Sequence, residues 1–357
     1  MAKNGSLEEL LKLMVEKNAS DLHLTVGSPP VLRINEELVP LGGPPLGEEE
    51  SRAMAYSLLT PEQIAAFERE RELDMSFGLE HLGRYRVNIF VQRGLVGVAI
   101  RLLPFHIRNF QECGLPARMM EEICQKKRGL VLVTGATGSG KSTTLASMVG
   151  WINDHRRCHV ITVEDPIEYV HANKLAIIDQ RELGTDTLSF HAALKHVLRE
   201  DPNVILIGEM RDLETIEAAL NIAETGHLVL ATLHTSDAVQ TVNRIVDVFP
   251  SHQQQQVRVQ LSFVLLAIFA QQLVPALAGD TRKLAAEVLI ATPAVRALIR
   301  EGKAHQIYSV IQTSQREGMR TMNQSLADLY LRKEIAYEQA LVRTPDAEEL
   351  LRLIQPG

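Results

Sequence analysis

A glycine-rich loop between a short apolar run and a helix-like stretch is the feature that most restricts how this chain folds. The apolar run ends at Thr134, the loop reads GATGSGKS over residues 135–142, and a helical pattern follows. The spacing matches G-x-x-x-x-G-K-[ST] in the strand–loop–helix setting that such a loop requires. The stretch therefore predicts an α/β sheet in which the loop leaves the carboxyl end of a strand.

Each residue type in this loop suits phosphate binding. Glycines let successive N–H groups turn inward, and the N-terminus of the following helix adds its positive dipole. We expect Lys141 to reach the β- and γ-phosphates of ATP, and the Ser142 hydroxyl to ligate Mg²⁺. An ordinary glycine-rich turn is the competing interpretation, and the flanking patterns count against it. The expected ATP/ADP contacts are Gly135, Ala136, Thr137, Gly138, Ser139, Gly140, Lys141, Ser142 and Thr143.

The chain divides into regions of different patterning. Residues 1–103 alternate apolar and polar side chains, with a hairpin expected at Gly94, and predict a small α+β domain with an antiparallel sheet. Residues 104–116 contain two prolines and no clear period, and are expected to form a linker. From 117 onward, apolar runs alternate with helical patterns, as in a parallel sheet covered on both faces.

The last third of the chain is expected to be mostly helical. No strand pattern persists over 239–357, so the longest apolar run, Phe263–Ala270, is interpreted as a buried helix segment. Its eight residues are too few to cross a bilayer, and no secretory signal is present. We therefore expect a cytoplasmic protein that contacts a membrane only through a partner.

Composition argues against several classes of protein. The length of 357 residues favours two or three domains. A net charge of −7 and only 4% aromatic residues count against nucleic acid as the main partner. Three cysteines, Cys113, Cys124 and Cys158, form no C-x-x-C pair and exclude a four-cysteine zinc site within one chain. Free thiols in a reducing compartment are the expected state.

Acidic residues stand where two other expected strands end. Glu164, Asp165 and Glu168 follow "VITV", and Glu209 and Asp212 follow "VILIG". Because the carboxyl ends of parallel strands meet at one edge of a sheet, these acids are expected near the loop. ATP hydrolysis needs an acid near the metal and a group that orients water. An acid at an arbitrary strand end is more often a helix cap or part of a solvated loop. Beside the glycine loop, a role in the nucleotide site becomes the favoured interpretation.

Two histidines and four arginines are weaker candidates. His227 and His234 flank the buried run "LVLATL", where a structural role is the common one. At the carboxyl end, His234 is a candidate sensor of the γ-phosphate or of a neighbouring subunit. The arginines of the N-terminal sheet form either a solvated face or arginine fingers that reach a nucleotide across a subunit boundary. They are Arg84, Arg86, Arg93 and Arg101.

Four stretches together resemble the secretion ATPases. "GATGSGKST" resembles the Walker A motif of that family, "ITVEDPIEY" its Asp box, "ILIGEMRD" its Walker B motif and "TGHLVLATLHT" its His box. The resemblance extends over nearly the whole chain. "AVRALIRE" at 294–301 resembles the AIRNLIRE helix of the PilT-type branch that retracts type IV pili, with Val295 for Ile and Ala297 for Asn. The extension and secretion branch usually carries a four-cysteine motif and a longer N-terminus, and this sequence has neither.

The resemblance implies a PAS-like N-terminal α+β domain followed by a RecA-like P-loop α/β ATPase domain, assembled as a homohexamer. It implies that Glu164 polarises the attacking water, and that Glu209 is the Walker B acid which, with Ser142, lies near Mg²⁺. It implies that His227 and His234 couple the site to domain movement.

The function implied by the resemblance is ATP hydrolysis that powers pilus retraction and twitching motility. An inner-membrane platform protein is the implied partner, and a second retraction ATPase is a further candidate. Three alternatives stay open. They are an accessory retraction ATPase of the PilU type, a nucleic-acid-dependent RecA-like motor, and a nucleotide-binding module that regulates without turnover.

Overall fold

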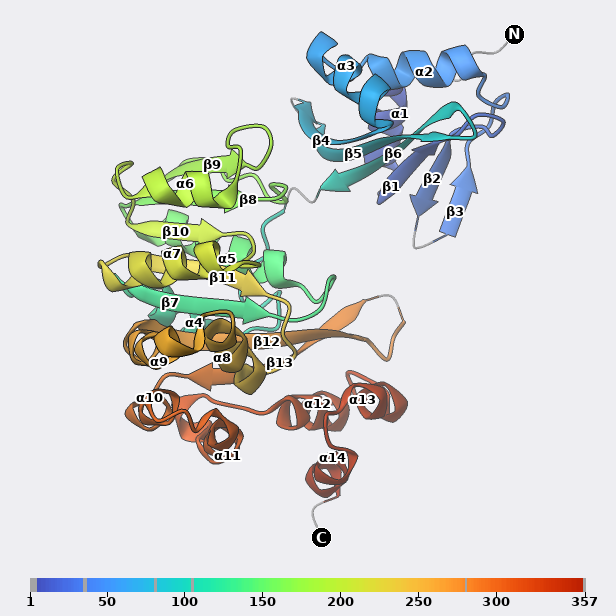
Figure 1. Ribbon diagram of the computed structural model, residues 1–357. Coiled ribbons are helices and arrows are strands. Elements are labelled where there is room, and N and C mark those ends of the chain that lie inside the picture. Colours follow the sequence, from blue (N-terminus) through green and yellow to red (C-terminus); the bar gives the residue numbers. More distant parts are fainter. Residues whose placement is uncertain (1–4, 35–36, 80–81, 104–105, 280, 356–357) are drawn as a thin grey trace. The chain divides into compact units, whose positions relative to one another are not determined.

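The computed structural model describes residues 5–34, 37–79, 82–103, 106–279 and 281–355 (Figure 1). By contacts the chain forms two compact units, each with its own sheet and hydrophobic core. One unit comprises Met1–His106 with Pro166–Val170, and the other comprises Ile107–Asp165 with His171–Gly357. Within the expected linker 104–116, Phe110 and Leu115 are buried in the core of the second unit.

The N-terminal unit is an antiparallel sheet of six strands in the order β3-β2-β1-β6-β5-β4, with three helices. Its elements are α1 (Leu7–Glu16), β1 (Asp21–Leu24), β2 (Val31–Ile34), β3 (Glu37–Pro40), α2 (Glu48–Tyr56), α3 (Pro61–Glu70), β4 (Glu72–Leu79), β5 (Gly83–Gln92) and β6 (Leu95–Leu103). The hairpin expected at Gly94 is confirmed, because Arg93 and Gly94 join β5 to β6 with φ of 51° and 79°. Two consecutive positive φ values match the twist of the flanking strands.

The second unit is built on a seven-stranded sheet in the order β13-β12-β7-β11-β10-β8-β9. Every pair is parallel except the hairpin of β12 and β13. The strands are β7 (Gly129–Thr134), β8 (His159–Glu164), β9 (Ile177–Glu182), β10 (Val204–Ile207), β11 (Leu228–Leu233), β12 (Leu265–Pro275) and β13 (Arg282–Ile290). The helices are α4 (Ala117–Cys124), α5 (Lys141–His155), α6 (Phe190–Val197), α7 (Leu213–Glu224), α8 (Ala238–Asp247), α9 (Ser251–Val264), α10 (Pro293–Arg300), α11 (Ile307–Thr313), α12 (Met322–Leu331), α13 (Tyr337–Arg343) and α14 (Ala347–Ile354).

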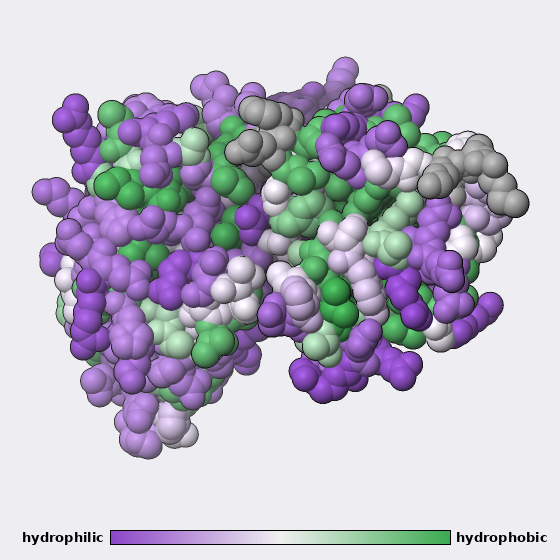
Figure 2. Space-filling model, turned by 90° about the horizontal axis from the view of Figure 1, so that it is seen from above, coloured by the Kyte–Doolittle hydropathy of each residue, from purple (hydrophilic) through white to green (hydrophobic). Residues whose placement is uncertain are grey.

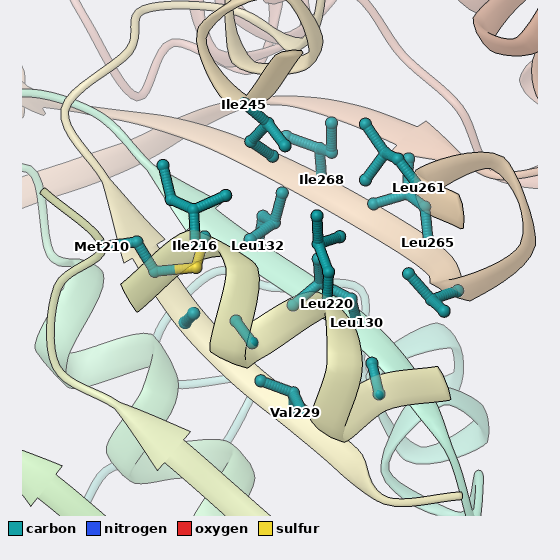
Figure 3. Packing of buried hydrophobic residues seen from close by; sticks show 14 of the residues in the cluster. Leu130, Leu132, Met210, Ile216, Leu220, Val229, Ile245, Leu261, Leu265 and Ile268 are labelled. Atoms are coloured by element: carbon teal, nitrogen blue, oxygen red, sulfur yellow. The ribbon is translucent and has the colours of Figure 1, made fainter. Parts of the chain in front are cut away.

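Helices cover both faces of this sheet, as the continuous apolar strands predict. Along β7, Leu130 and Leu132 pack under α6 to α9, whereas Val131 and Val133 pack under α4 and α5. Figure 3 shows the first of these layers, with Leu132, Ile216 and Ile268 from three different elements in one cluster. Both faces of β7 are therefore covered by helices, and the strand lies inside the sheet with the glycine loop at its carboxyl end.

The prediction of a helix at Phe263–Ala270, with no strand after Val239, is wrong. Helix α9 ends at Val264, and β12 begins at Leu265 between β7 and β13. A strand buried on both faces has the same uninterrupted apolar sequence as a buried helix, so periodicity does not separate the two. The correction matters for function, because β12 is the direct neighbour of β7 and of the loop that follows it.

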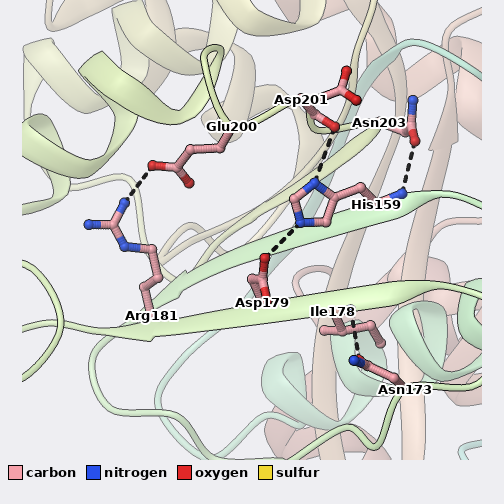
Figure 4. A network of polar contacts seen from close by, with 8 residues as sticks. All are labelled: His159, Asn173, Ile178, Asp179, Arg181, Glu200, Asp201 and Asn203. Carbon is pink, nitrogen blue, oxygen red and sulfur yellow. Dashed lines mark hydrogen bonds and ion pairs between the residues drawn. The ribbon is translucent and has the colours of Figure 1, made fainter.

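The edge strand β9 is held by polar contacts of Asp179 and Arg181, two of its residues. His159 Nε2 lies 2.9 Å from Asp179 Oδ2, and its Nδ1 lies 3.1 Å from the Asp201 carbonyl oxygen (Figure 4). At the other end of β9, Arg181 Nη1 donates to Glu200 Oε1 at 2.9 Å. The His159 contacts lie at the far end of β8 from Glu164, whereas Arg181 pairs with Val163, next to Glu164. The network therefore supports β9 along most of its length.

On the face seen in Figure 2, polar side chains predominate, and apolar side chains form areas between them. Large apolar side chains with high exposure include Leu188 and Phe263. Among the described residues, none of the helices combines the length and apolar character needed to span a bilayer.

Candidate functional site

The glycine loop connects β7 to α5, and its backbone requires glycine. Gly135, Gly138 and Gly140 have φ of 140°, 79° and 92°, a region that other residues rarely adopt. A Cβ at Gly135 would lie 2.4 Å from the Gln271 carbonyl oxygen and 2.6 Å from Ser139 Oγ. The start of the loop is therefore pressed against β12, and a side chain at Gly135 would displace it.

Lys141 lies over the loop that precedes it. Its Nζ donates to the carbonyl oxygens of Gly135 at 2.8 Å and Ala136 at 3.0 Å. Ser142 is half-buried in the first turn of α5. The positive charge of Lys141 and the positive end of the α5 dipole thus lie at the loop, which fits the phosphates of a nucleotide.

Three further strand ends line the same edge of the sheet as the loop. Thr134 on β7 pairs with Leu233 on β11, and Ile207 on β10 pairs with both Ala231 on β11 and Val163 on β8. At a spacing of about 4.8 Å between strands, the β10 end lies roughly 10 Å from the β7 end and the β8 end roughly 14 Å. The sheet therefore brings three side chains to the loop edge. His234 follows β11, Glu209 lies two residues after the end of β10, and Glu164 is the last residue of β8.

Glu164, the last residue of β8, is half-buried and oriented by two neighbours. Its Oε1 accepts hydrogen bonds from Thr162 Oγ1 at 2.6 Å and from Gln180 Nε2 at 3.3 Å. Thr162 lies two residues back on the same strand, and Gln180 lies on β9. A carboxylate held in this way is suited to orienting a water molecule.

Glu209 is held between a cation and a histidine. Its Oε2 lies 2.8 Å from Arg211 Nη2, and its Oε1 lies 3.2 Å from His234 Nε2. Burial alone would raise the pKa of Glu209, but the hydrogen bond from Arg211 and the charges of His234 and Arg211 outweigh it, so the pKa is lowered. The carboxylate is therefore ionised at neutral pH. Together with the Ser142 hydroxyl it offers the hard oxygen ligands that Mg²⁺ prefers.

The other candidate acids cap a helix or lie outside the row formed by Glu164 and Glu209. Asp212 is the N-cap of α7, where its Oδ1 accepts from the Thr215 N–H at 2.8 Å, the structural role that competed with a catalytic one. Asp165 is exposed next to Glu164, and Glu168 lies in the segment 166–170 that clusters with the N-terminal unit. The structure thus brings Glu164 and Glu209 to the loop edge, and it uses Asp212 as a helix cap.

The two histidines lie at opposite ends of β11. His234 contacts Glu209, whereas His227 precedes the strand and its Nδ1 lies 3.2 Å from the Ile222 carbonyl oxygen. The six residues of the strand separate them by roughly 20 Å. Within one subunit, only His234 is part of the loop edge.

The four arginines of the N-terminal sheet differ in their contacts. Arg84 Nη2 donates to Ser76 Oγ at 2.6 Å, and Arg101 Nε donates to Asp21 Oδ1 at 2.8 Å. Arg93 occupies the turn of the hairpin, and Arg86 is an exposed residue paired with Arg101 across the strands. Arg86 therefore places an exposed positive charge on the N-terminal sheet.

Two residues that support the site were missed by the sequence interpretation. Gln271 on β12 is buried and exchanges hydrogen bonds of 2.8 Å and 3.2 Å with Thr144 in the first turns of α5. Gly208 approaches the backbone of β8 so closely that a Cβ would lie 3.1 Å from Glu164 Cα. A polar "QQ" within the apolar stretch "LLAIFAQQLV" is the one signal that would have indicated Gln271.

Comparison with known families matches residues 86–328, more than half of the chain, to the family described as Type II/IV secretion system protein. The chain belongs to this family. Its α/β architecture, with the glycine loop at one edge of a mostly parallel sheet, is that expected of a secretion ATPase, so the fold prediction is confirmed.

Named relatives within the secretion family cover nearly the whole chain. The type IV pilus ATPase PilU of Pseudomonas aeruginosa is 43% identical over 98% of this chain and 91% of its own length. The type IV pilus retraction ATPase PilT of the same organism is 44% identical over 94% of this chain and 96% of its own length. A twitching motility protein of Neisseria gonorrhoeae is 47% identical over 90% of this chain and 86% of its own length.

Solved structures of the family agree with the fold. The crystal structure of the pilus retraction motor PilT with bound ADP is 49% identical, covers 98% of this chain and 99% of its own, and superposes with a TM-score of 0.92. The ATPase DotB of Legionella pneumophila is 26% identical over 96% of both chains, with a TM-score of 0.80.

Proposed function

We propose that this secretion-family member is a Mg²⁺-dependent ATPase that powers retraction of type IV pili and thereby twitching motility. The observation that carries the proposal is the row of Lys141, Glu209 and Glu164 at one sheet edge, in a chain similar to retraction ATPases over nearly its full length. The reaction converts ATP and water to ADP and phosphate, and no covalent enzyme intermediate is needed.

Each residue of the edge has a distinct part in this reaction. The loop 135–143 binds the phosphates through its N–H groups, and Lys141 adds a positive charge that offsets their negative charge. The Glu164 carboxylate orients the attacking water, and Glu209 and Ser142 would hold Mg²⁺, directly or through water. A bound Mg²⁺ neutralises charge that develops on the phosphate oxygens. His234 contacts Glu209 and is placed to report the state of the site to the rest of the chain.

The proposal extends to assembly and location. We propose a cytoplasmic homohexamer that contacts the inner membrane through the pilus platform protein and works beside a second retraction ATPase. His227 is then a candidate for contacts across subunits, since it lies at the other end of β11 from the loop edge. The arginines of the N-terminal sheet are further candidates. We propose 1–103 and 117–357 as the working domains, with 104–116 as the linker, and hydrolysis drives their relative movement.

Complementation in cells and hydrolysis in solution test the proposal. Purified protein is expected to release phosphate from Mg²⁺–ATP, and to lose this activity with Lys141→Ala. Expression in a strain that lacks its retraction ATPase is expected to restore twitching, whereas the Lys141→Ala variant is not. Hydrolysis without restored twitching would retain the ATPase and reject the retraction motor.

An accessory retraction ATPase is the second candidate function. The observation that favours it is the similar identity to PilU and PilT, 43% and 44%. Separate complementation of strains lacking one or the other protein distinguishes the two, because an accessory ATPase restores only the strain that still has its own principal motor.

A further inference from the structure

One buried acid, Glu287 in the middle of β13, has no part in the functions assigned above. Glu287 is 2% exposed. It lies within an edge strand of the sheet, whereas the acids of the proposed site lie at the ends of inner strands. A carboxylate this deeply buried is costly unless its oxygens accept hydrogen bonds. Its contacts therefore indicate why it is there.

Glu287 lies level with the loop edge across the sheet. It pairs with Ala270 on β12, Ala270 pairs with Thr134 on β7, and Thr134 pairs with Leu233 on β11. Thr134 precedes the glycine loop, and Leu233 precedes His234. Three strand spacings, roughly 14 Å, thus join Glu287 to the residues that lead into the site.

The carboxylate accepts a hydrogen bond from the start of α8. Glu287 Oε1 lies 2.8 Å from the N–H of Ala238, the first residue of that helix, and both residues are buried. An ionised or neutral carboxyl group satisfies this N–H, which has no partner inside the helix. Since the two residues are 49 positions apart, this contact ties β13 to the chain that leaves β11.

The segment between His234 and α8 is anchored on the same helix turn. Thr235 Oγ1 lies 2.7 Å from Thr241 Oγ1, and Thr241 Oγ1 donates to the Asp237 carbonyl oxygen at 2.6 Å. Asp237 Oδ1 accepts from the Gln240 N–H at 2.8 Å. The first turn of α8 therefore fixes the segment 234–237, and with it the His234 side chain that contacts Glu209.

We infer that Glu287 is a positioning residue of the proposed ATPase site, which holds the N-terminus of α8 so that His234 stays against Glu209. The inference rests on the proposed function and adds a residue to it. It also makes β13 the connection between the C-terminal helices and the site. Ala285, on the same face of β13, packs against α12 and α14, whereas Leu289 packs with the cluster that contains α8.

The groups around Glu287 are themselves polar or acidic. Asp237 approaches from α8, Glu349 from α14 and the Tyr308 hydroxyl from α11. Burial raises the pKa of Glu287 to about 7, and the charges of Asp237 and Glu349 act in the same direction, although the N–H groups of Ala238 and of Met322, at the starts of α8 and α12, lower it.

Variants on both sides of the contact test the inference in full-length protein. Glu287→Ala removes the acceptor. Ala238→Pro removes the donor at the first helical position, where proline is well tolerated. Glu287→Gln keeps a carbonyl acceptor of the same shape. Ser325→Ala is the matched control, because Ser325 Oγ accepts from the N–H of Ala286, next to Glu287, and joins β13 to α12 without touching α8.

The measurements are ATP turnover, the Kd for a fluorescent ADP analogue, thermal unfolding and light scattering to confirm equal assembly. We expect Glu287→Ala and Ala238→Pro each to lower kcat about tenfold or more with Kd changed less than about twofold, since a small misplacement near the reaction is costly. Glu287→Gln and Ser325→Ala should retain nearly the wild-type kcat. The kcat of the double variant Glu287→Ala/Ala238→Pro should fall no further than the kcat of either single variant, because both changes remove the same contact.

The outcomes separate this inference from the proposed function. Wild-type turnover together with unchanged kcat in folded Glu287→Ala, or in Ala238→Pro if the former does not fold, overturns the inference alone. An equal loss in Ser325→Ala also overturns it, because the effect then follows stability rather than the contact with α8. A wild-type protein that binds nucleotide without hydrolysing it overturns the proposed function and this inference with it.

Discussion

Gly208, after β10, lies directly against the backbone of Glu164, at the end of β8. Its N–H donates to the Val163 carbonyl oxygen at 2.8 Å, and a Cβ built on it would lie 3.1 Å from Glu164 Cα. The next residue is Glu209. The absence of a side chain at one position thus lets the two strand ends approach, and it sets the spacing of the two acids to which we assign water orientation and metal binding.

Gly208→Ala is expected to impair turnover more than folding. A Cβ tighter than ordinary contact would move Glu164 or Glu209 by a few tenths of an ångström, which we expect to lower kcat about tenfold and stability by about 1–2 kcal/mol. Steady-state phosphate release and thermal unfolding measure the two effects. Gly42→Ala is the control, since a Cβ there meets no atom within 4 Å. Wild-type kcat in Gly208→Ala would show that the close approach is unimportant.

Glu164→Gln is expected to separate binding from hydrolysis. The amide keeps the shape of the side chain but not the charge that orients water, so phosphate release should fall at least about 100-fold while nucleotide affinity stays unchanged. Asp212→Asn is the matched control, because asparagine caps α7 as well as aspartate does. Single-turnover hydrolysis and nucleotide titration check both variants. If the two lose equal activity, the assignment of water orientation to Glu164 is wrong.

The local parts of the site can be predicted from the sequence, because local chemistry determines them. The β7–loop–α5 unit follows from the glycine spacing and the flanking patterns. The strand ends at Glu164 and Glu209 follow from apolar runs that stop at an acid. All these signals lie within about ten residues of the feature they predict.

The parts that could not be predicted depend on contacts between distant segments. The run from Phe263 to Ala270 is apolar throughout, so only its place between β7 and β13 decides that it is mostly strand. Gly208 has no unusual backbone angle, and its importance comes from Glu164, 44 positions away. The Gln271–Thr144 pair joins residues 127 positions apart. No window of sequence contains both members of such a pair.

Two glycines of the loop should respond differently to the same substitution. Both have positive φ, 140° at Gly135 and 79° at Gly138, so alanine strains the backbone at either, by roughly 1–3 kcal/mol. At Gly135 the Cβ would also lie 2.4 Å from the Gln271 carbonyl oxygen, whereas at Gly138 it meets no atom within 4 Å. Without nucleotide, Gly135→Ala should therefore lower the melting temperature clearly more than Gly138→Ala. Equal melting temperatures would mean that β12 does not press on the loop.

Glu287→Gln should change how stability depends on pH. Burial raises the pKa of Glu287 to about 7 in the folded protein, against about 4.5 when exposed. Stability is therefore lost as pH rises from about 4.5 through 7, by up to about 3 kcal/mol from this group. Glutamine does not titrate, so the variant should gain stability relative to wild type between pH 5 and pH 7.5. Urea unfolding at several pH values measures the difference, and parallel curves would contradict it.

His171 should act in the opposite direction. Burial lowers its pKa to about 4 in the folded protein, with a smaller contribution from Lys174, and its Nδ1 is buried without a hydrogen-bond partner among the described residues. The unfolded chain takes up this proton near pH 6.5, so stability present above that pH is lost as pH falls toward 4. The loss amounts to about 2 kcal/mol by pH 5.

His171→Gln should remove this acid-side loss, because glutamine does not bind the proton that the unfolded wild type takes up. The measurement is the difference in unfolding free energy between variant and wild type at pH 7.5 and pH 5, which cancels the other histidines. His305→Gln, at an exposed residue, is the control for replacing a histidine by glutamine. If His171→Gln behaves like His305→Gln, burial does not lower the pKa of His171 in the folded protein.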